Sequence, residues 1–171
     1  MTEPSAQYHF HHPEKMIGDR AELLEIIAGQ RLMTLAMAAD GQPYLATMNY
    51  GFDAEANCFY FHGATAGKKV AIMTANPNVW GQVIEDRGYV TGKCDHAYRS
   101  VHFAGRVVFL EDEDEKRAAL TLMIRQMEPD PEPLIQRLLV RGRLTKTIVG
   151  RVQVSEMTGK RNALEPLGKE S

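Results

Sequence analysis

The first regular element that the hydrophobic pattern predicts is a short helix ending at Gly29. Asp19, followed three residues later by Glu22, is typical of a helix N-terminus, because both side chains can bond free backbone amides. The residues before it, 1–14, have no usable period, so we predict an N-terminal arm there. The apolar face of the helix is expected to consist of Leu23, Leu24, Ile26 and Ile27.

Strand-like alternation follows the helix from Arg31 onward. Asp40 and Gly41 tolerate positive φ and therefore predict a tight hairpin turn between two strands. In the second strand, one face carries Tyr44, Ala46, Met48, Tyr50 and Phe52, and the other, more polar face carries Leu45, Thr47, Asn49 and Gly51. A turn at 53–57 and an aromatic strand at 58–62 complete three successive antiparallel candidates.

The second half of the chain mixes helices with strands. We predict helices at 67–75, at 134–140, and through Leu120, Met123, Ile124 and Met127. Strands are expected at 79–85, 98–110 and 147–155. The segment 86–97 is predicted to be a long loop and 128–133 a stiff connector. The acidic run 111–115 suits a solvated helix start. About six strands with inserted helices favour a mainly β, six-stranded antiparallel barrel over a parallel doubly wound sheet. The pattern gives one domain, 15–162, and a C-terminal tail, 163–171.

Composition and charge exclude several classes of protein. The 171 residues include 20 Lys and Arg against 22 Asp and Glu, and this balance argues against nucleic acid as a partner. Apolar runs are too short to span a bilayer and the N-terminus does not resemble a signal peptide, so we expect a cytoplasmic protein with no membrane partner. The two cysteines, Cys58 and Cys94, are expected to be reduced.

The glycine-flanked run from Gly63 to Lys69 precedes a predicted helix. It is not a Walker loop, because only three residues separate its glycines and Lys69 stands where that motif has Ser or Thr. The underlying chemistry remains: a helix N-terminus offers free amides, and Lys68 and Lys69 attract an anion. The run is therefore either a mononucleotide phosphate site or a solvated strand-to-helix turn.

The histidines do not predict a metal site. His9, His11 and His12 match no standard ligand spacing, and three adjacent residues at 94–96 cannot easily converge on one ion. His102 lies within a strand and is interpreted as a hydrogen-bonded structural residue. His62 is the best placed histidine for chemistry, since it follows the aromatic strand and precedes the lysine-bearing turn.

The order of several short motifs resembles the FMN-binding split-barrel proteins related to pyridoxamine 5'-phosphate oxidase, nearest the nitroimidazole-resistance branch. The resemblance spans about 15–162. The motifs that carry it are the residues at 40–44, 48–51, 60–63, 67–69, 76–77, 98–101, 105–106 and 157–161. No single one of these motifs would suffice, but together they recur in the order found in the family.

The resemblance implies a homodimer that binds two FMN molecules at the subunit interface, with residues from both chains in each site. It places Thr47, Met48 and Asn49 along the isoalloxazine, Lys68 and Lys69 on the FMN phosphate, His62 near the flavin or its ligand, Gln82 beside the flavin, and Arg99 and Ser100 within reach of a phosphate. This sequence departs from the family in having Trp80 where relatives commonly carry a small or sulfur residue, and Thr47 where a proline is usual.

The leading hypothesis is an FMN-dependent oxidoreductase that passes electrons to a small acceptor, such as a nitro-aromatic or quinone-like compound. In it, His62 is the candidate catalytic residue, as a proton donor or a holder of the acceptor. No serine or cysteine nucleophile with a paired histidine is apparent. The alternatives are a haem- or flavin-binding module without turnover, with His62, His96 or His102 as an axial ligand, and a cofactor-free structural dimer.

Overall fold

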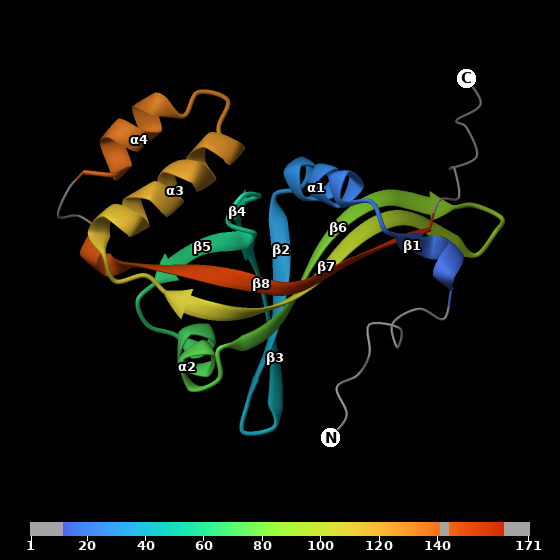
Figure 1. The fold of residues 1–171 in the computed structure, drawn as a ribbon, viewed down its shortest axis with the longest axis horizontal. Coiled ribbons are helices and arrows are strands. Elements are labelled where there is room, and N and C mark those ends of the chain that lie inside the picture. Colours follow the sequence, from blue (N-terminus) through green and yellow to red (C-terminus); the bar gives the residue numbers. More distant parts are fainter. Residues whose placement is uncertain (1–11, 141–143, 163–171) are drawn as a thin grey trace.

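One antiparallel sheet of eight strands dominates the protein (Figure 1). The computed structural model describes residues 12–140 and 144–162, so most of the predicted arm and all of the predicted tail lie outside the described residues. The strand order is β3-β2-β6-β7-β8-β5-β4, and β1 pairs with β8. The strands are β1 (Met16–Ile17), β2 (Leu32–Ala39), β3 (Gln42–Asn49), β4 (Gly51–Asp53), β5 (Cys58–Ala64), β6 (Asn78–Val90), β7 (Asp95–Phe109) and β8 (Thr147–Asn162).

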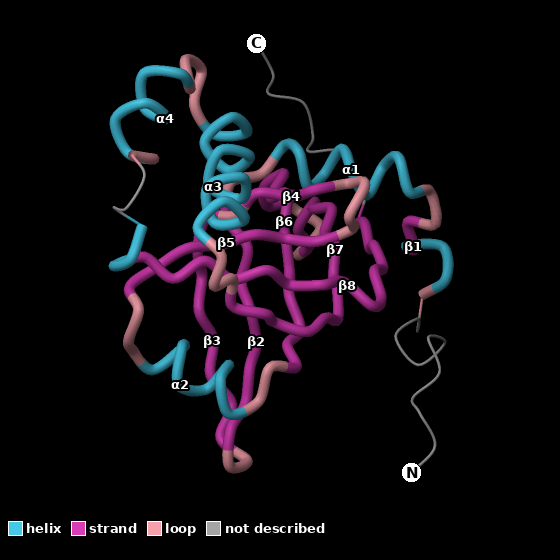
Figure 2. The backbone as a smooth tube through the Cα atoms, turned by 60° about the vertical axis from the view of Figure 1, so that its left-hand side comes forward, coloured by secondary structure: helices cyan, strands magenta, loops and turns pink. Residues whose placement is uncertain are grey.

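The helices lie around this sheet rather than between successive strands. They are α1 (Arg20–Gly29), α2 (Lys68–Ala75), α3 (Glu113–Met127) and α4 (Glu132–Leu138), with short 3-10 turns η2 (Pro13–Lys15) and η3 (Leu144–Lys146). Figure 2 shows α2 at the opposite end of the sheet from α1 and α3. The strands β2 and β3 run across the direction of β7 and β8 in Figure 1, so the sheet is strongly coiled.

The predicted helix starts and turns are confirmed by local hydrogen bonds. The Asp19 carboxylate accepts a bond from the Ala21 amide at 2.9 Å and caps α1. Asp40 and Gly41 have φ of 51° and 73°, as the tight β2–β3 hairpin requires. The Asp112 carboxylate caps α3 by accepting from two amides of its first turn.

The long loop predicted at 86–97 is wrong, because β6 and β7 continue through it as a paired ribbon. Their register extends to Val90 opposite Asp95, which leaves a turn of only four residues, 91–94. A bulge between Asp86 and Gly88 interrupts the alternation, and Gly88 has φ of 97°. The glycines therefore mark a bulge and a turn. Likewise β8 continues to Asn162, seven residues beyond the predicted end, and the short β1 and β4 raise the strand number above six.

Two hydrophobic clusters share the strands β5 and β8. The main cluster lies between the coiled sheet and α1 and takes Phe59, Phe61 and Val152 from these strands. The second lies under α3 and takes Val149, with Tyr60 packed against it. Successive side chains point to opposite faces of a strand, so each of the two strands serves both clusters.

Two glycines make room for aromatic rings inside the main cluster. Gly81 pairs across the ladder with Phe103, and Gly150 pairs with Phe61. A Cβ added at Gly81 would lie 2.0 Å from the Phe103 ring, and one at Gly150 would lie 2.2 Å from the Phe61 ring. Each ring therefore lies directly over the bare backbone of the neighbouring strand. Phe103 also stacks on Phe59, with ring centroids 4.1 Å apart.

Substitution Gly81→Ala is expected to lower the free energy of unfolding by about 1–3 kcal/mol, because the fully buried Phe103 ring must move out of its stack. Urea unfolding followed by circular dichroism measures the change. Gly29→Ala is the matched control, because a Cβ there meets no atom within 4 Å. An equal effect of the two substitutions would contradict the packing argument.

Candidate functional site

A row of polar side chains crosses five strands on the sheet face turned away from the main cluster. The register places Thr47, Thr34, Gln82, His102 and Thr158 directly opposite one another on β3, β2, β6, β7 and β8. The two threonine hydroxyls lie 2.9 Å apart. The Gln82 amide nitrogen lies 3.3 Å from Nε2 of His102 and can only donate, so this nitrogen accepts. Two predicted site residues, Thr47 and Gln82, thus belong to one row.

An open apolar cleft of about 860 Å³ adjoins this row on the same face. Its walls include Ala36, Trp80 and Ala104, which form the next row of the ladder, and Arg106 at its rim. Trp80 is 42% exposed, and the neighbouring Leu45 and Ile84 are also exposed. So much apolar surface on one face is typical of an interaction site.

The three residues of β3 that were predicted to lie along the isoalloxazine ring point to different faces of the strand. Met48 points into the main cluster and is buried, so only its backbone could meet a ligand on the polar face. Thr47 and Asn49 are exposed, and the Asn49 amide donates to the carbonyl of Arg31 at 3.1 Å. Among the described residues, β3 is the end strand of the sheet and pairs only with β2, so its other edge offers backbone donors and acceptors.

The two predicted phosphate lysines open α2 beside β3. Lys68 Nζ lies 4.7 Å from the centre of the Tyr44 ring, which brings the helix start to the strand that carries Thr47. Thr47 lies three residues further along the strand than Tyr44, a distance of about 10 Å. Gly67, before the helix, has φ of 142°, and a Cβ there would meet nothing within 4 Å. The helix end therefore faces open space.

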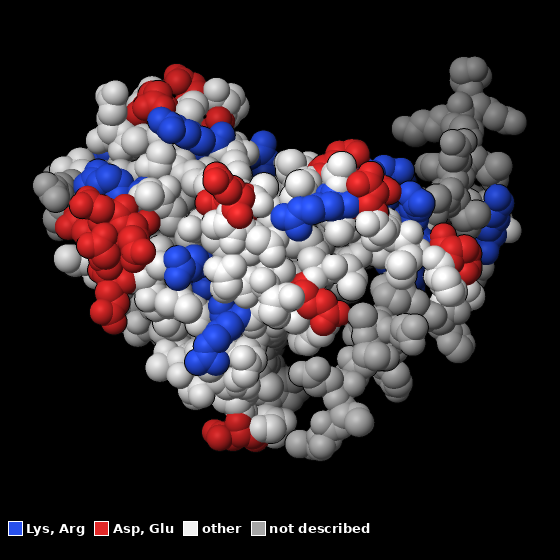
Figure 3. Space-filling view, in the orientation of Figure 1, with Lys and Arg blue, Asp and Glu red and all other residues white. Residues whose placement is uncertain are grey.

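This helix end carries unsatisfied donors as well as charge. The first backbone bond that closes α2 runs from the Ala71 amide to the carbonyl of Gly67, and Gly67 offers no side-chain cap. The amides of the first turn therefore have no partner within the helix. Figure 3 shows basic side chains near α2, whereas acidic side chains gather over the start of α3. Backbone amides and lysines together suit an anionic group.

His62 lies next to this basic turn, near the end of β5. The side chain is exposed at one end of β5, yet surrounding protein atoms displace enough water to lower the pKa of the imidazole, and the nearby Lys69 charge lowers it further. His62 has no hydrogen bond to another described residue. Both ring nitrogens are therefore available, and at neutral pH the neutral form offers one donor and one acceptor.

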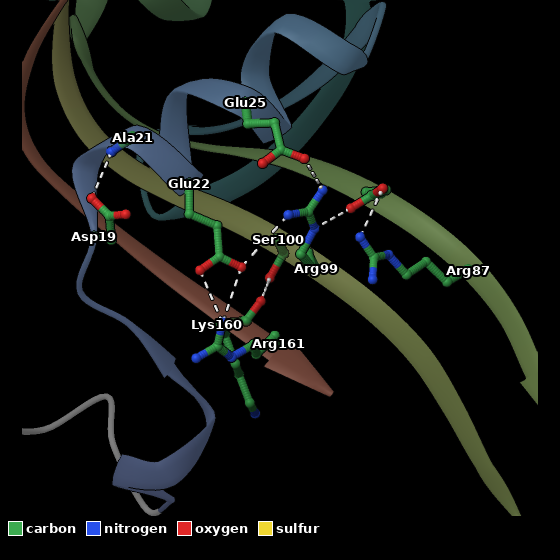
Figure 4. Close-up of polar contacts among 10 residues, drawn as sticks. Asp19, Ala21, Glu22, Glu25, Arg87, Arg99, Ser100, Lys160 and Arg161 are labelled. Atoms are coloured by element: carbon green, nitrogen blue, oxygen red, sulfur yellow. Dashed lines mark hydrogen bonds and ion pairs between the residues drawn. The ribbon is translucent and has the colours of Figure 1, made fainter. Parts of the chain in front are cut away.

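Arg99 is placed differently from the expectation that it reaches a phosphate. Its guanidinium bonds Glu85 on β6, and it also pairs with Glu25 at 2.9 Å and Glu22 at 3.6 Å on α1 (Figure 4). Glu22 pairs in turn with Arg161 at 2.9 Å. The carboxylates raise the pKa of Arg99 and neutralise its charge within the chain, so its role is to join α1 to the β6–β7 ribbon.

Ser100 is buried, and its hydroxyl lies 3.3 Å from Nε2 of His102 and 3.4 Å from the carbonyl oxygen of Lys160. Two residues before His102 on β7, it lies on the same face as the polar row and supports His102 there. Sequence reasoning also missed Thr34 and Tyr44 as neighbours of the predicted site residues, and it named His102 only as a structural residue or an axial ligand of haem. Strand register and a cation–π contact place these residues beside the predicted ones, and neither leaves a motif in the local sequence.

The Arg99 network makes the stability of the fold depend on pH. Arg99 lowers the pKa of Glu85 and Glu25 below the ordinary 4.5, so the network stabilises the fold above that pH and loses its contribution as pH falls through the lowered values. Urea unfolding at about pH 6 and about pH 3 should therefore show a larger acid loss in the wild type than in Arg99→Met. Arg87→Met, which removes a weaker contributor to the same lowered pKa values, should show an acid loss between those of the other two proteins. Equal acid losses in all three proteins would contradict this assignment.

Two of the other histidines contact nearby carboxylates. His12 contacts Glu14 at 2.8 Å, and His96 Nε2 contacts the Asp86 carboxylate at 2.6 Å across the ribbon. His9 and His11 lie outside the described residues. In residues 12–140 and 144–162 no group of three His, Cys, Asp or Glu side chains could hold a metal ion. Across the same residues, no helix combines the length and apolar character needed to span a membrane.

The coiled antiparallel sheet with peripheral helices is a split β-barrel, and comparison with known proteins supports this class. A sequence model of the pyridoxamine 5'-phosphate oxidase family matches residues 19–161. The chain therefore belongs to this family, and the resemblance seen in the sequence motifs is confirmed. None of the curated proteins compared matches the sequence.

Many solved structures are similar to this chain, including these three. A protein from Bacteroides thetaiotaomicron, provisionally described as a 5-nitroimidazole antibiotic resistance protein, is 27% identical with a TM-score of 0.68 over 85% of this chain and 86% of its own. A FAD-binding protein from Mesorhizobium loti is 24% identical, with a TM-score of 0.60 and coverage of 85% and 96%. A FAD and heme binding protein from Mycobacterium smegmatis is 18% identical, with a TM-score of 0.75 and coverage of 91% and 77%. The last two establish likeness of fold alone.

Proposed function

We propose that this chain is an FMN-binding oxidoreductase that reduces a small acceptor, such as a nitro-aromatic compound. The observation that carries the proposal is the start of α2, where unsatisfied amides lie together with two lysines, Lys68 beside Tyr44 of β3 and Lys69 beside Gly63 of β5. Membership of the pyridoxamine 5'-phosphate oxidase family and similarity to proteins described as flavin-binding support it. Flavin, when bound, supplies the electron transfer, so the chain needs no nucleophile of its own.

The residues present fit an FMN molecule at both of its ends. Lys68, Lys69 and the amides of the first turn of α2 would hold the phosphate, in the open space at Gly67. The edge of β3 at Thr47 and Asn49, about 10 Å along the strand from Tyr44, would meet the polar rim of the ring. His62, which has a lowered pKa and no hydrogen-bond partner in 12–140 and 144–162, would exchange a proton with the acceptor or hold it by a hydrogen bond.

We further propose that a second copy of the chain covers the apolar cleft and completes each flavin site. Exposed Trp80, Leu45 and Ile84 give that face the apolar character of an interface, and the polar row with Gln82 crosses it. Covering the cleft would also exclude water from any ring bound at the β3 edge. The acceptor and the second copy are the partners that this function requires.

Flavin binding is tested by titrating the purified protein with FMN and following the shift of its visible absorption. We expect Lys68→Ala and Lys69→Ala each to weaken FMN about tenfold, since each removes a charge-assisted contact worth roughly 1.5 kcal/mol. Riboflavin lacks the phosphate, so its affinity should not change in either variant. Lys93→Ala, which removes a charge in the β6–β7 turn, is the control. A protein that takes up no FMN would refute the proposed function.

Dimerisation is tested by sedimentation of the wild type and of the double variant Leu45→Lys and Ile84→Lys. We expect the wild type to sediment near twice the chain mass of 19.2 kDa and the variant near the single mass, because two buried ammonium groups oppose association. Both positions are exposed within one subunit, so the fold should be retained. A monomeric wild type would contradict the covered cleft.

A further inference from the structure

A second cavity, of about 330 Å³, lies between the sheet and the helices α3 and α4. It occupies the end of the second hydrophobic cluster, where the packing under α3 stops short of β5 and β8. It reaches solvent beside His62 and Leu138, which are both exposed. Its apolar wall consists of Leu120, Met123, Ile124, Met127, Leu134, Leu138, Leu139 and Leu144.

The sheet supplies the polar end of this cavity. His62 pairs with Val149, and Ala64 pairs with Thr147, so the side chains of these four residues share one face of the β5–β8 ladder. His62 and Thr147 line the cavity, and neither side chain has a hydrogen-bond partner among the described residues. An apolar chamber with hydrogen-bonding groups confined to one end is typical of a site for a small organic molecule.

Size and charge narrow the class of ligand. A dry cavity of about 150 Å³ accommodates benzene, so about 330 Å³ suits a molecule of one or two rings. The charged groups around the cavity are of opposite sign, with Glu128 in its wall and Lys69 close to His62. Their fields oppose each other, and the remaining wall is apolar, so an uncharged ligand is favoured over an ion.

We propose that this cavity binds an uncharged, mainly apolar molecule of one or two rings whose oxygen forms a hydrogen bond with His62. The inference deepens the proposed function and rests on it for one point only, that the bound molecule is the electron acceptor. The cavity itself belongs to a single chain and requires no flavin, so binding can be measured separately from flavin uptake.

The test uses acetophenone, a neutral single ring with one carbonyl oxygen, added to purified protein with ¹⁵N-labelled histidine. We expect the imidazole nitrogens of His62, assigned from the His62→Gln variant, to shift on titration. Ethylbenzene has nearly the same shape without the oxygen and should bind about threefold to tenfold more weakly, as loss of one hydrogen bond implies. Benzoate should bind more weakly than acetophenone, because the apolar wall disfavours its charge.

Filling the cavity provides the decisive comparison. Leu134→Trp and Leu138→Trp each place an indole in the wall from α4 and should weaken acetophenone at least tenfold. Gln136→Trp adds the same side chain to an exposed position of α4 outside the cavity, and its affinity should equal that of the wild type. Either filling variant suffices if the other fails to fold, which circular dichroism will report.

Two results would overturn the inference: acetophenone that leaves the His62 nitrogens unmoved, or folded filling variants that bind it as well as Gln136→Trp does. FMN titration of the same samples separates this outcome from failure of the flavin proposal. If acetophenone binds at His62 in a protein that never takes up FMN, the cavity is a ligand site, and only the assignment of its ligand as the electron acceptor is wrong.

Discussion

The packing of aromatic rings over bare glycine backbone is the constraint on which the rest of the molecule depends. Phe103 lies over Gly81, and Phe61 lies over Gly150, each across one rung of the ladder. Side chains at the glycine positions would force the strands apart, so the coil of the sheet requires both glycines. The stack of Phe103 on Phe59 then ties the β6–β7 ribbon to β5. Through that stack, the polar row and the basic turn after β5 are held in one rigid body.

Alternation along β5 connects this core to the chemistry. Phe61 faces the main cluster and the adjacent His62 faces the opposite side, toward α3 and α4. A register slip of one residue would bury the imidazole and expose the ring, and the fit of Phe61 over Gly150 prevents it. The position of His62 is therefore determined by its neighbour in sequence. Both the proposed flavin chemistry and the second cavity depend on that placement.

Local signals predicted much of the fold, and long-range contacts account for what was missed. Asp19, Asp40 and Asp112 marked helix starts and a hairpin correctly, because each acts on residues beside it. The contact between Arg99 and Glu25 joins residues 74 positions apart, so the predicted phosphate role of Arg99 could not be separated from a structural one by local pattern. Only the end of the β6–β7 ribbon, residues 86–97, was mistaken for a loop, because a bulge at Gly88 breaks the period there. The lysines and His62 were singled out by the glycine-flanked turn before a helix and by the family motifs, whereas the cavity beneath α4 has no signature in one stretch of sequence.

Trp80 is the single tryptophan of the chain and lies 42% exposed in the wall of the open cleft. Indole emission moves to shorter wavelength when water is removed from the ring. The fluorescence of Trp80 therefore reports whether water reaches that face of the sheet. The indole of Trp80 thus gives the cleft a natural fluorophore, whose emission can be recorded without any label.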